Sequence, residues 1–401
     1  MAVGEHNLAF NIVPGVRLAS IAAGIKSSGS TDLVLFEFAE GSVSAGVFTQ
    51  SVFAAAPVVL GKRHLAAASP RYFLINSGNA NAAVGDAGIV DAEQCCAALS
   101  QSAGVRPEQV IPFSTGVIGE RLPVQKITDP LAQLVAALDE TKWLEAAHGI
   151  MTTDTRPKIA TRRFNIADEE IVITGIAKGA GMIQPNMATM LSYVATNISS
   201  PQALIEAALK ESVDRSFNRI TVDSDTSTND SCMLTATAQT KANLNDVDCL
   251  EQFQTELNAL MLELAHGIVR DAEGATKFVE VAVKGAARAQ DCLDIAYAIA
   301  NSPLMKTALY ASDANWGRIV MAIGKAGVHL DVSKLDVFLG DVQLMKQGQK
   351  ETSYTEQAGA AIMANEEIVI TVDLNAGEFD TRVWTSDLSH EYVRINAEYR
   401  T

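Results

Sequence analysis

Short apolar segments typical of β-strands alternate along this chain with longer segments typical of α-helices, and their spacing is irregular. A doubly wound parallel sheet needs a helical crossover of regular length between successive strands. That regularity is missing, so the sequence predicts an α+β sandwich. We expect strands at residues 33–38, 44–48, 56–60, 72–76, 110–113, 160–166, 170–176, 191–196, 278–284, 337–339, 367–372, 382–385 and 392–395. We expect helices at residues 91–103, 130–139, 142–149, 201–213 (after an N-cap at Ser200), 246–270, 289–300 and 318–324.

The composition is that of an ordinary globular protein with an acidic surface. Of the 401 residues, 48% are hydrophobic and 19% are charged, and the formal net charge is -16. Such a charge repels phosphate backbones and anionic membranes, so we expect neither nucleic acid nor a membrane as a partner. The sequence shows no N-terminal secretion signal and no apolar run of membrane-spanning length, so we expect a cytoplasmic protein.

The cysteines lack the spacing of a disulfide framework or a zinc site. Their number is odd, no two form a C-x-x-C pair, and no histidine lies at ligand spacing from them. We therefore expect buried, reduced thiols at all of them. They are Cys95, Cys96, Cys232, Cys249 and Cys292. Because no other group of residues has the spacing of metal ligands, the sequence predicts no metal cofactor.

The segment from Lys178 to Leu191 combines two glycines and a proline with a threonine where a predicted strand begins. Glycine and proline make it an irregular loop that leads into that strand. A threonine at a strand start is most often only a β-former. The alternative is chemical. If the chain breaks between Ala188 and Thr189, the new N-terminal amine, with a pKa of roughly 7.7–8.0, is a base for the threonine hydroxyl.

Other catalytic patterns are weaker. The six histidines are scattered, and none accompanies a G-x-S-x-G serine elbow. Ser114-Thr115-Gly116 follows a predicted strand and could present a hydroxyl and a backbone N–H as an oxyanion hole, although a plain turn is the commoner role of Thr-Gly. The polar run from Asp223 to Asp230 lacks the glycine and distal glutamate of a calcium hand. For that run we favour a self-bonded turn or a buried polar network.

The segment from Lys178 to Leu191 closely resembles the self-cleavage segment of the ornithine acetyltransferase family, the glutamate N-acetyltransferases of arginine biosynthesis. The resemblance covers essentially the whole chain, and further blocks occur in the family's order. These blocks are Gly46-Val-Phe-Thr-Gln, Asn76-Ser-Gly-Asn-Ala-Asn-Ala, Ser114-Thr-Gly-Val-Ile-Gly, Met151-Thr-Thr-Asp-Thr, Val222-Asp-Ser-Asp-Thr-Ser-Thr-Asn-Asp and Ser302-Pro-Leu-Met-Lys-Thr-Ala with Asn315-Trp-Gly-Arg-Ile. Each block is moderately specific, and their common order makes the resemblance strong.

The resemblance implies a layered α/β/β/α-type sandwich with mixed sheets and a smaller C-terminal α/β subdomain from about residue 280. It implies autoproteolysis into an α chain, residues 1–188, and a β chain, residues 189–401, which stay together as an α2β2 heterotetramer. The implied reaction moves the acetyl group of N2-acetyl-L-ornithine to L-glutamate through an acetyl-Thr189 intermediate. Acetyl-CoA is a possible second donor, and the sequence does not distinguish monofunctional from bifunctional members.

The resemblance also implies the site residues. Thr189 is the nucleophile, and Thr115 and Gly116 stabilise the oxyanion. The implied substrate-binding residues are Thr155, Lys178, Thr189, Glu273, Asn396 and Thr401. Family spacing favours Thr155 over its neighbours Thr152 and Thr153. The alternative function is a self-cleaving aminopeptidase of the same fold type, which would hydrolyse rather than transfer an acyl group.

Overall fold

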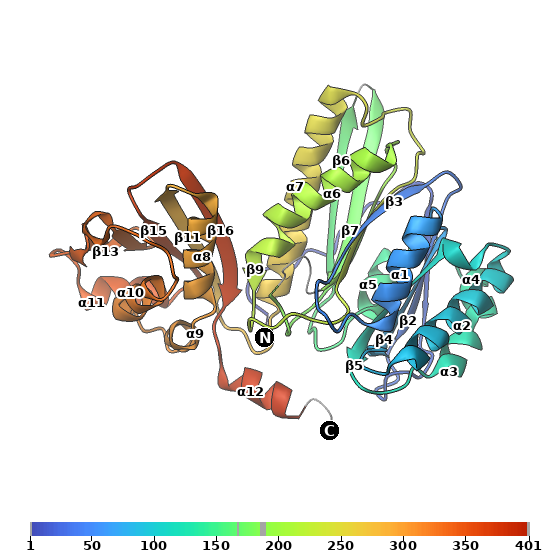
Figure 1. The fold of residues 1–401 in the computed structure, drawn as a ribbon, viewed down its shortest axis with the longest axis horizontal. Coiled ribbons are helices and arrows are strands. Elements are labelled where there is room, and N and C mark those ends of the chain that lie inside the picture. The colour runs from blue at the N-terminus through green and yellow to red at the C-terminus, as the bar shows by residue number, and fades with distance from the viewer. Residues whose placement is uncertain (1, 167, 185–189, 399–401) are drawn as a thin grey trace. The chain divides into compact units, whose positions relative to one another are not determined.

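A computed structural model describes residues 2–166, 168–184 and 190–398 (Figure 1). The chain forms two compact units. The larger unit comprises described residues within 6–218 and 226–268, and the smaller one comprises residues 2–5, 219–225 and 269–398.

Two mixed β-sheets form the centre of the larger unit. The four-stranded sheet has the order β1-β2-β4-β5, and the five-stranded sheet has the order β3-β10-β8-β7-β6. Neighbouring strands are antiparallel except for the parallel pairs β4–β5 and β8–β10. The strands are β1 (Val16–Ile21), β2 (Leu33–Phe38), β3 (Val43–Phe48), β4 (Tyr72–Asn79), β5 (Val110–Val117), β6 (Lys158–Ile166), β7 (Glu169–Lys178), β8 (Leu191–Thr196) and β10 (Ser231–Ala236).

An aromatic core fills the space between these two sheets. Phe36 and Phe73 of the four-stranded sheet pack against Tyr193 of the five-stranded sheet, with ring centroids 5.4 and 6.0 Å apart. The rings of Trp143 and Phe36 form an edge-to-face pair with their centroids 5.8 Å apart. All four side chains are almost completely buried. Such edge-to-face and tilted pairs stabilise a core beyond the apolar area that they bury.

Helices cover the outer faces of both sheets. A second apolar cluster packs α2 and its neighbours against the far side of the four-stranded sheet. On the five-stranded sheet, Leu260 and Leu264 of α7 lie against Gly175 of β7, where a Cβ would come within 3.3 Å of both side chains. The helices of this unit are α1 (Ala56–Ala67), α2 (Asp86–Ala103), α3 (Val124–Thr128), α4 (Leu131–Ala136), α5 (Trp143–Gly149), α6 (Gln202–Arg215) and α7 (Val247–Arg270). The helix–sheet–sheet–helix order confirms the expected α+β sandwich.

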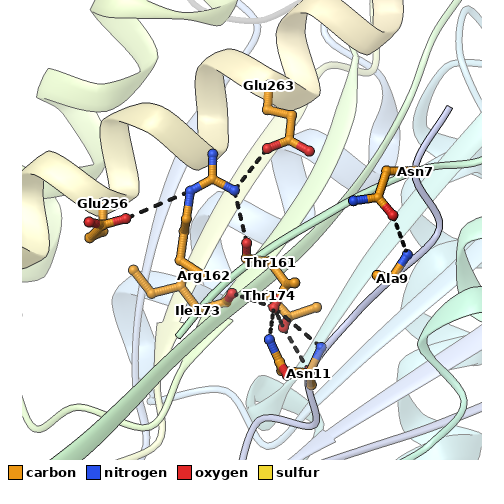
Figure 2. Close-up of polar contacts among 9 residues, drawn as sticks. All are labelled: Asn7, Ala9, Asn11, Thr161, Arg162, Ile173, Thr174, Glu256 and Glu263. Carbon is orange, nitrogen blue, oxygen red and sulfur yellow. Dashed lines mark hydrogen bonds and ion pairs between the residues drawn. The ribbon is translucent and has the colours of Figure 1, made fainter. Parts of the chain in front are cut away.

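Polar contacts attach further elements to β6 and β7 (Figure 2). Arg162 of β6 forms ion pairs with Glu256 at 3.7 Å and with Glu263 at 2.8 Å, both on α7. The hydroxyl of Thr174 on β7 donates to the carbonyl of Asn11 at 2.7 Å. Thr161 and Thr174 are joined by a hydroxyl–hydroxyl hydrogen bond of 2.8 Å. The N-terminal segment and α7 are therefore both fixed to the same strand pair.

The smaller unit is a seven-stranded mixed sheet with the order β14-β13-β12-β15-β11-β16-β9. Its apolar core joins β11 to α8 through side chains such as Val281, Val283, Ile295 and Ile299. The strands are β9 (Ile220–Thr221), β11 (Phe278–Ala286), β12 (Asp336–Leu339), β13 (Val342–Lys346), β14 (Gln349–Lys350), β15 (Glu367–Asp373) and β16 (Phe379–Ser386). The helices are α8 (Ala289–Ala300), α9 (Pro303–Tyr310), α10 (Trp316–Gly324), α11 (Glu356–Met363) and α12 (His390–Ala397).

Three local predictions were wrong. The apolar run 56–60 begins helix α1, because Pro57 in the first turn has a φ angle suited to a helix. The run 392–395 belongs to helix α12, whose first turn is capped by the hydroxyl of Ser389. Ser200 is not the N-cap of α6; that position is Pro201, which has no side-chain cap.

The prediction for the cysteines is confirmed, because all five are free and buried. Burial raises the pKa of the Cys95 and Cys232 thiols to about 12, so both stay protonated at neutral pH. In the part of the chain that the structure describes, no helix is long and apolar enough to cross a membrane.

We expect Phe36→Ala to lower the free energy of unfolding by about 3–5 kcal/mol, because it opens a cavity between the two sheets. Phe53 is 71% exposed, so Phe53→Ala is a matched control whose effect should stay within about 0.5 kcal/mol. Urea denaturation followed by circular dichroism measures both. Equal losses in the two variants would contradict a close-packed core at Phe36.

Candidate active site

The predicted self-cleavage segment connects two antiparallel neighbours of the five-stranded sheet. Lys178 is the last residue of β7, and it pairs with Leu191, the first residue of β8. The chain therefore leaves β7 and enters β8 at the same end of the sheet. Ala188 and Thr189, the proposed cleavage pair, lie outside the described residues, as does Thr401.

A buried ion pair holds the point where this segment leaves β7. The carboxylate of Asp154 accepts the N–H of Gly179 at 2.7 Å, and the ammonium group of Lys158 donates to the carbonyl of Gly179 at 3.1 Å. Lys158 and Asp154 are paired with each other, and their side chains are 3% and 0% exposed. The same carboxylate accepts the N–H of Thr152 at 2.9 Å. Both polar groups of Gly179 are thus bound by charged side chains, which form stronger hydrogen bonds than neutral groups do.

The electrostatics favour an ionised Asp154. Burial by itself raises the pKa of this carboxyl, but the charges of Lys158 and Lys178 and the hydrogen bonds outweigh it and lower the pKa to about 2. Lys26 also interacts electrostatically with Asp154 and Lys178. Burial and the charge of Lys178 lower the pKa of Lys26, although the carboxylates of Asp32 and Asp154 oppose that shift. Lys158 thus contacts Asp154 directly, while Lys26 and Lys178 interact with Asp154 through their charges.

The predicted oxyanion loop lies at the end of β5. Ser77 pairs with Thr115 and Gly78 with Gly116 where β4 and β5 run in parallel. Gly116 has a φ of +135°, and a Cβ there would come within 2.3 Å of the carbonyl carbon of Gly78. Only glycine fits such a close approach. Thr115 is buried beside it, so the pair is set by backbone packing.

Asn229 fixes this loop to the neighbouring segments. Its side-chain amide donates to the carbonyl of Ala80 at 2.6 Å and to the carbonyl of Ser114 at 2.9 Å. The hydroxyl of Ser114 donates to Asn76 at 2.6 Å. The family block that contains Asn229 therefore contacts the block that begins at Ser114, at the carbonyl directly before Thr115.

The polar run 223–230 ends in a buried network, which agrees with the interpretation favoured from its sequence. Asn229 and Asp230 are 6% and 3% exposed. Burial raises the pKa of Asp230 well above its usual value, while the charge of Lys178 and hydrogen bonds from Ser227 oppose the shift. Asp230 therefore belongs to the electrostatic surroundings of Lys178.

Thr155 lies directly after the buried Asp154 and is exposed, whereas Thr152 and Thr153 are half-buried. The main-chain N–H of Thr152 is bound to Asp154. Of these three threonines, Thr155 thus presents the most accessible side chain.

The smaller unit brings two of the implied binding residues together. The side-chain amide of Asn396 donates to the carboxylate of Glu273 at 2.7 Å, across 123 residues of sequence. Glu273 is only 7% exposed. Ser389 secures α12, which carries Asn396, by donating to the carbonyl of Gly274 at 2.7 Å. A buried carboxylate with an amide partner is suited to binding an ammonium group.

Sequence reasoning missed Lys26, Asp154, Lys158 and Asn229. Asp154 and Asn229 lie within motifs that were singled out, yet the pattern gave no means of ranking them above their neighbours. Lys158 begins an ordinary strand, and Lys26 lies in a Gly/Ser-rich loop, so neither carries a local signal.

The larger unit is therefore an α+β sandwich. A loop that begins with Gly179 follows strand β7, and the Thr115-Gly116 pair lies at the end of strand β5. Comparison with known proteins agrees with the resemblance seen in the sequence. The model of the ArgJ family matches residues 17–401. The chain belongs to the ArgJ family.

Curated relatives share about half of their residues with this chain. The arginine biosynthesis bifunctional protein ArgJ of Pseudomonas syringae pv. tomato is 52% identical over 408 residues, covering 100% of both chains. The protein of the same name from Methylococcus capsulatus is 50% identical and covers 97% of this chain and 96% of its own. A crystal structure of ArgJ from Bacillus halodurans is 38% identical, covers 51% of this chain and 96% of its own, and has a TM-score of 0.48.

We expect Asp154→Asn to destabilise the protein at pH 7 by about 3–5 kcal/mol, because it leaves the Lys158 ammonium buried without a counter-charge. The folded-state pKa of Asp154 is about 2, below its usual 3.8. The ionised carboxylate therefore stabilises the fold above about pH 4, and this contribution disappears as the pH falls towards 2. The difference between wild type and variant should accordingly narrow by roughly 2 kcal/mol over that window.

Urea denaturation at several pH values measures this difference. Asp139→Asn is the matched control, because Asp139 is exposed and its carboxylate accepts a local hydrogen bond from Thr141. A pH-independent difference between wild type and Asp154→Asn would contradict the lowered pKa.

Proposed function

We propose that this protein is an acetyltransferase that moves the acetyl group of N2-acetyl-L-ornithine to L-glutamate. Thr189 is its nucleophile, and it becomes N-terminal when the precursor cleaves itself after Ala188. The names of the relatives, which place them in arginine biosynthesis, support the pathway. The observation that supports this site is the anchoring of Gly179, with which the segment containing the proposed cut begins after β7.

The chemistry follows from the groups assigned. The N-terminal amine of Thr189 takes the hydroxyl proton as the oxygen attacks the acetyl carbonyl. Thr115 and Gly116 donate to the oxyanion that forms. When the C–N bond breaks, the proton passes to the leaving amine of ornithine, and an acetyl-threonyl ester remains. The amine of glutamate then attacks this ester, and the threonine hydroxyl is restored.

Binding of the amino-acid parts uses complementary charge. We assign Lys178 to a substrate carboxylate and Glu273 to the side-chain ammonium of ornithine. Asn396 can contact either end of a zwitterion, because it both donates and accepts hydrogen bonds. Thr155 and Thr401 complete the proposed binding set.

The word "bifunctional" in the names of the relatives supports acetyl-CoA as a second acetyl donor. No further cofactor is proposed. We further propose that the α and β chains assemble as an α2β2 heterotetramer in the cytoplasm.

Self-cleavage predicts two species in denaturing mass analysis of the purified protein, with 188 and 213 residues. Thr189→Val removes the hydroxyl but keeps a similar shape, so this variant should remain a single chain. Thr189→Ser keeps a hydroxyl and should still be cut. An uncut wild-type chain after long incubation, or a cut Thr189→Val chain, would rule out the mechanism.

The donor is tested by supplying glutamate with either N2-acetyl-L-ornithine or acetyl-CoA and measuring N-acetylglutamate by mass spectrometry. We expect product from both donors. Product from acetylornithine alone would mark a monofunctional enzyme. The rival self-cleaving aminopeptidase would yield no N-acetylglutamate from either donor.

A further inference from the structure

The loop before β2 carries a lysine whose main chain is held rigidly. The buried carboxylate of Asp32 accepts the backbone N–H groups of Ala23 and Ile25, each at 2.6 Å, and that of Lys26 at 2.9 Å. Asp32 is 0% exposed, whereas Lys26 is half-buried and so partly open to solvent. Three charge-assisted bonds therefore fix the direction in which the Lys26 side chain leaves the loop.

The Lys26 side chain lies against Gly78 of β4, the strand beside the candidate oxyanion loop. A Cβ on Gly78 would come within 3.1 Å of the Cγ of Lys26. Gly78 pairs with Gly116, and a Cβ on Gly116 would come within 2.3 Å of the carbonyl carbon of Gly78. The Lys26 stem thus packs on the strand next to Gly116.

The carboxylates near Lys26 are already committed to other donors. Asp32 is occupied by the three N–H groups of its own loop. Asp154 binds Lys158, Gly179 and Thr152. The ammonium group of Lys26 donates instead to a backbone carbonyl, that of Thr31, at 2.9 Å. The charge on Lys26 is therefore not matched by a directly bound carboxylate among the described residues.

We propose that Lys26 binds the α-carboxylate of the N-acetylated amino acid while its acetyl group lies at the oxyanion loop. This inference rests on the proposed function and adds a binding residue to it. A partly exposed lysine on a rigid loop, with its stem beside the strand neighbour of Gly116, fits an anion that reaches the site from solvent. Burial and the charge of Lys178 lower the pKa of Lys26, and the negative charge of a bound carboxylate would offset both effects.

A purely structural role is the competing explanation, because Lys26 also tethers its loop through Thr31. The chain offers a matched control for that role. Lys126 donates to the carbonyl of Gly24 in the same loop, but its side chain is exposed. Lys126→Met therefore removes a comparable tether without removing a cation next to the oxyanion loop.

The test compares N2-acetyl-L-ornithine with its α-carboxamide, which keeps the acetyl group and loses the negative charge. In the wild type and in Lys126→Met, we expect the amide to have a kcat/KM about 10–100-fold lower, the value of one charge-assisted contact. In Lys26→Met, kcat/KM for the acid should fall by about 10-fold or more, and that for the amide should hardly change. The preference for the acid is then weaker than in the wild type, and Lys178 supplies whatever preference remains.

A Lys26→Met variant that still prefers the acid as strongly as wild type would overturn the proposal. If Lys26→Met does not give folded, processed enzyme, Lys26→Gln must weaken the preference for the acid and Lys26→Arg must keep it. The opposite pattern overturns the proposal equally. Failure of the proposed function is distinguishable, because wild type and Lys126→Met would then transfer no acetyl group at all, and both proposals would fall together.

Discussion

The buried ion pair between Asp154 and Lys158 is the interaction on which the candidate site depends. Burying two charges costs more than burying apolar side chains of similar size, so such a pair is a poor source of stability by itself. Here it binds both the N–H and the C=O of Gly179, which belong to the two peptide groups on either side of that residue. The pair thus fixes the direction in which the chain leaves β7 and, with it, the place of Lys178.

The oxyanion loop is positioned by a different device. Gly78 and Gly116 approach so closely that backbone contact alone sets their relation, and Asn229 ties the preceding carbonyl to a second loop. Among the described residues, neither these contacts of Gly78 and Asn229 nor the ion pair at Gly179 involve the side chains of Thr115 or Lys178. The residues assigned to chemistry are therefore held by neighbours that have no chemical role of their own, a common way to fix an active-site geometry within tenths of an ångström.

Local sequence patterns predicted most elements of the fold. Strand 191–196 and helix 289–300 were predicted with their observed limits, because in both the apolar periodicity and the flanking breakers agree. The run 56–60 was misread because a short apolar segment fits a strand and a buried helix equally well, and Pro57 decides between them only through its place in the first turn. Local sequence patterns could not predict which polar side chains pair with one another. Nothing near Lys158 indicates that it pairs with Asp154, and Glu273 and Asn396 were linked only through the family resemblance.

The strand order of the five-stranded sheet has a consequence for a protein cut before β8. The α chain would supply β3, β6 and β7, and the β chain would supply β8 and β10. The order β3-β10-β8-β7-β6 inserts the two strands of one chain between those of the other, with ladders on both sides. Separating the chains would then mean dismantling a buried sheet. Dilution would not dissociate them, and exchange of chains between molecules would be as slow as global unfolding.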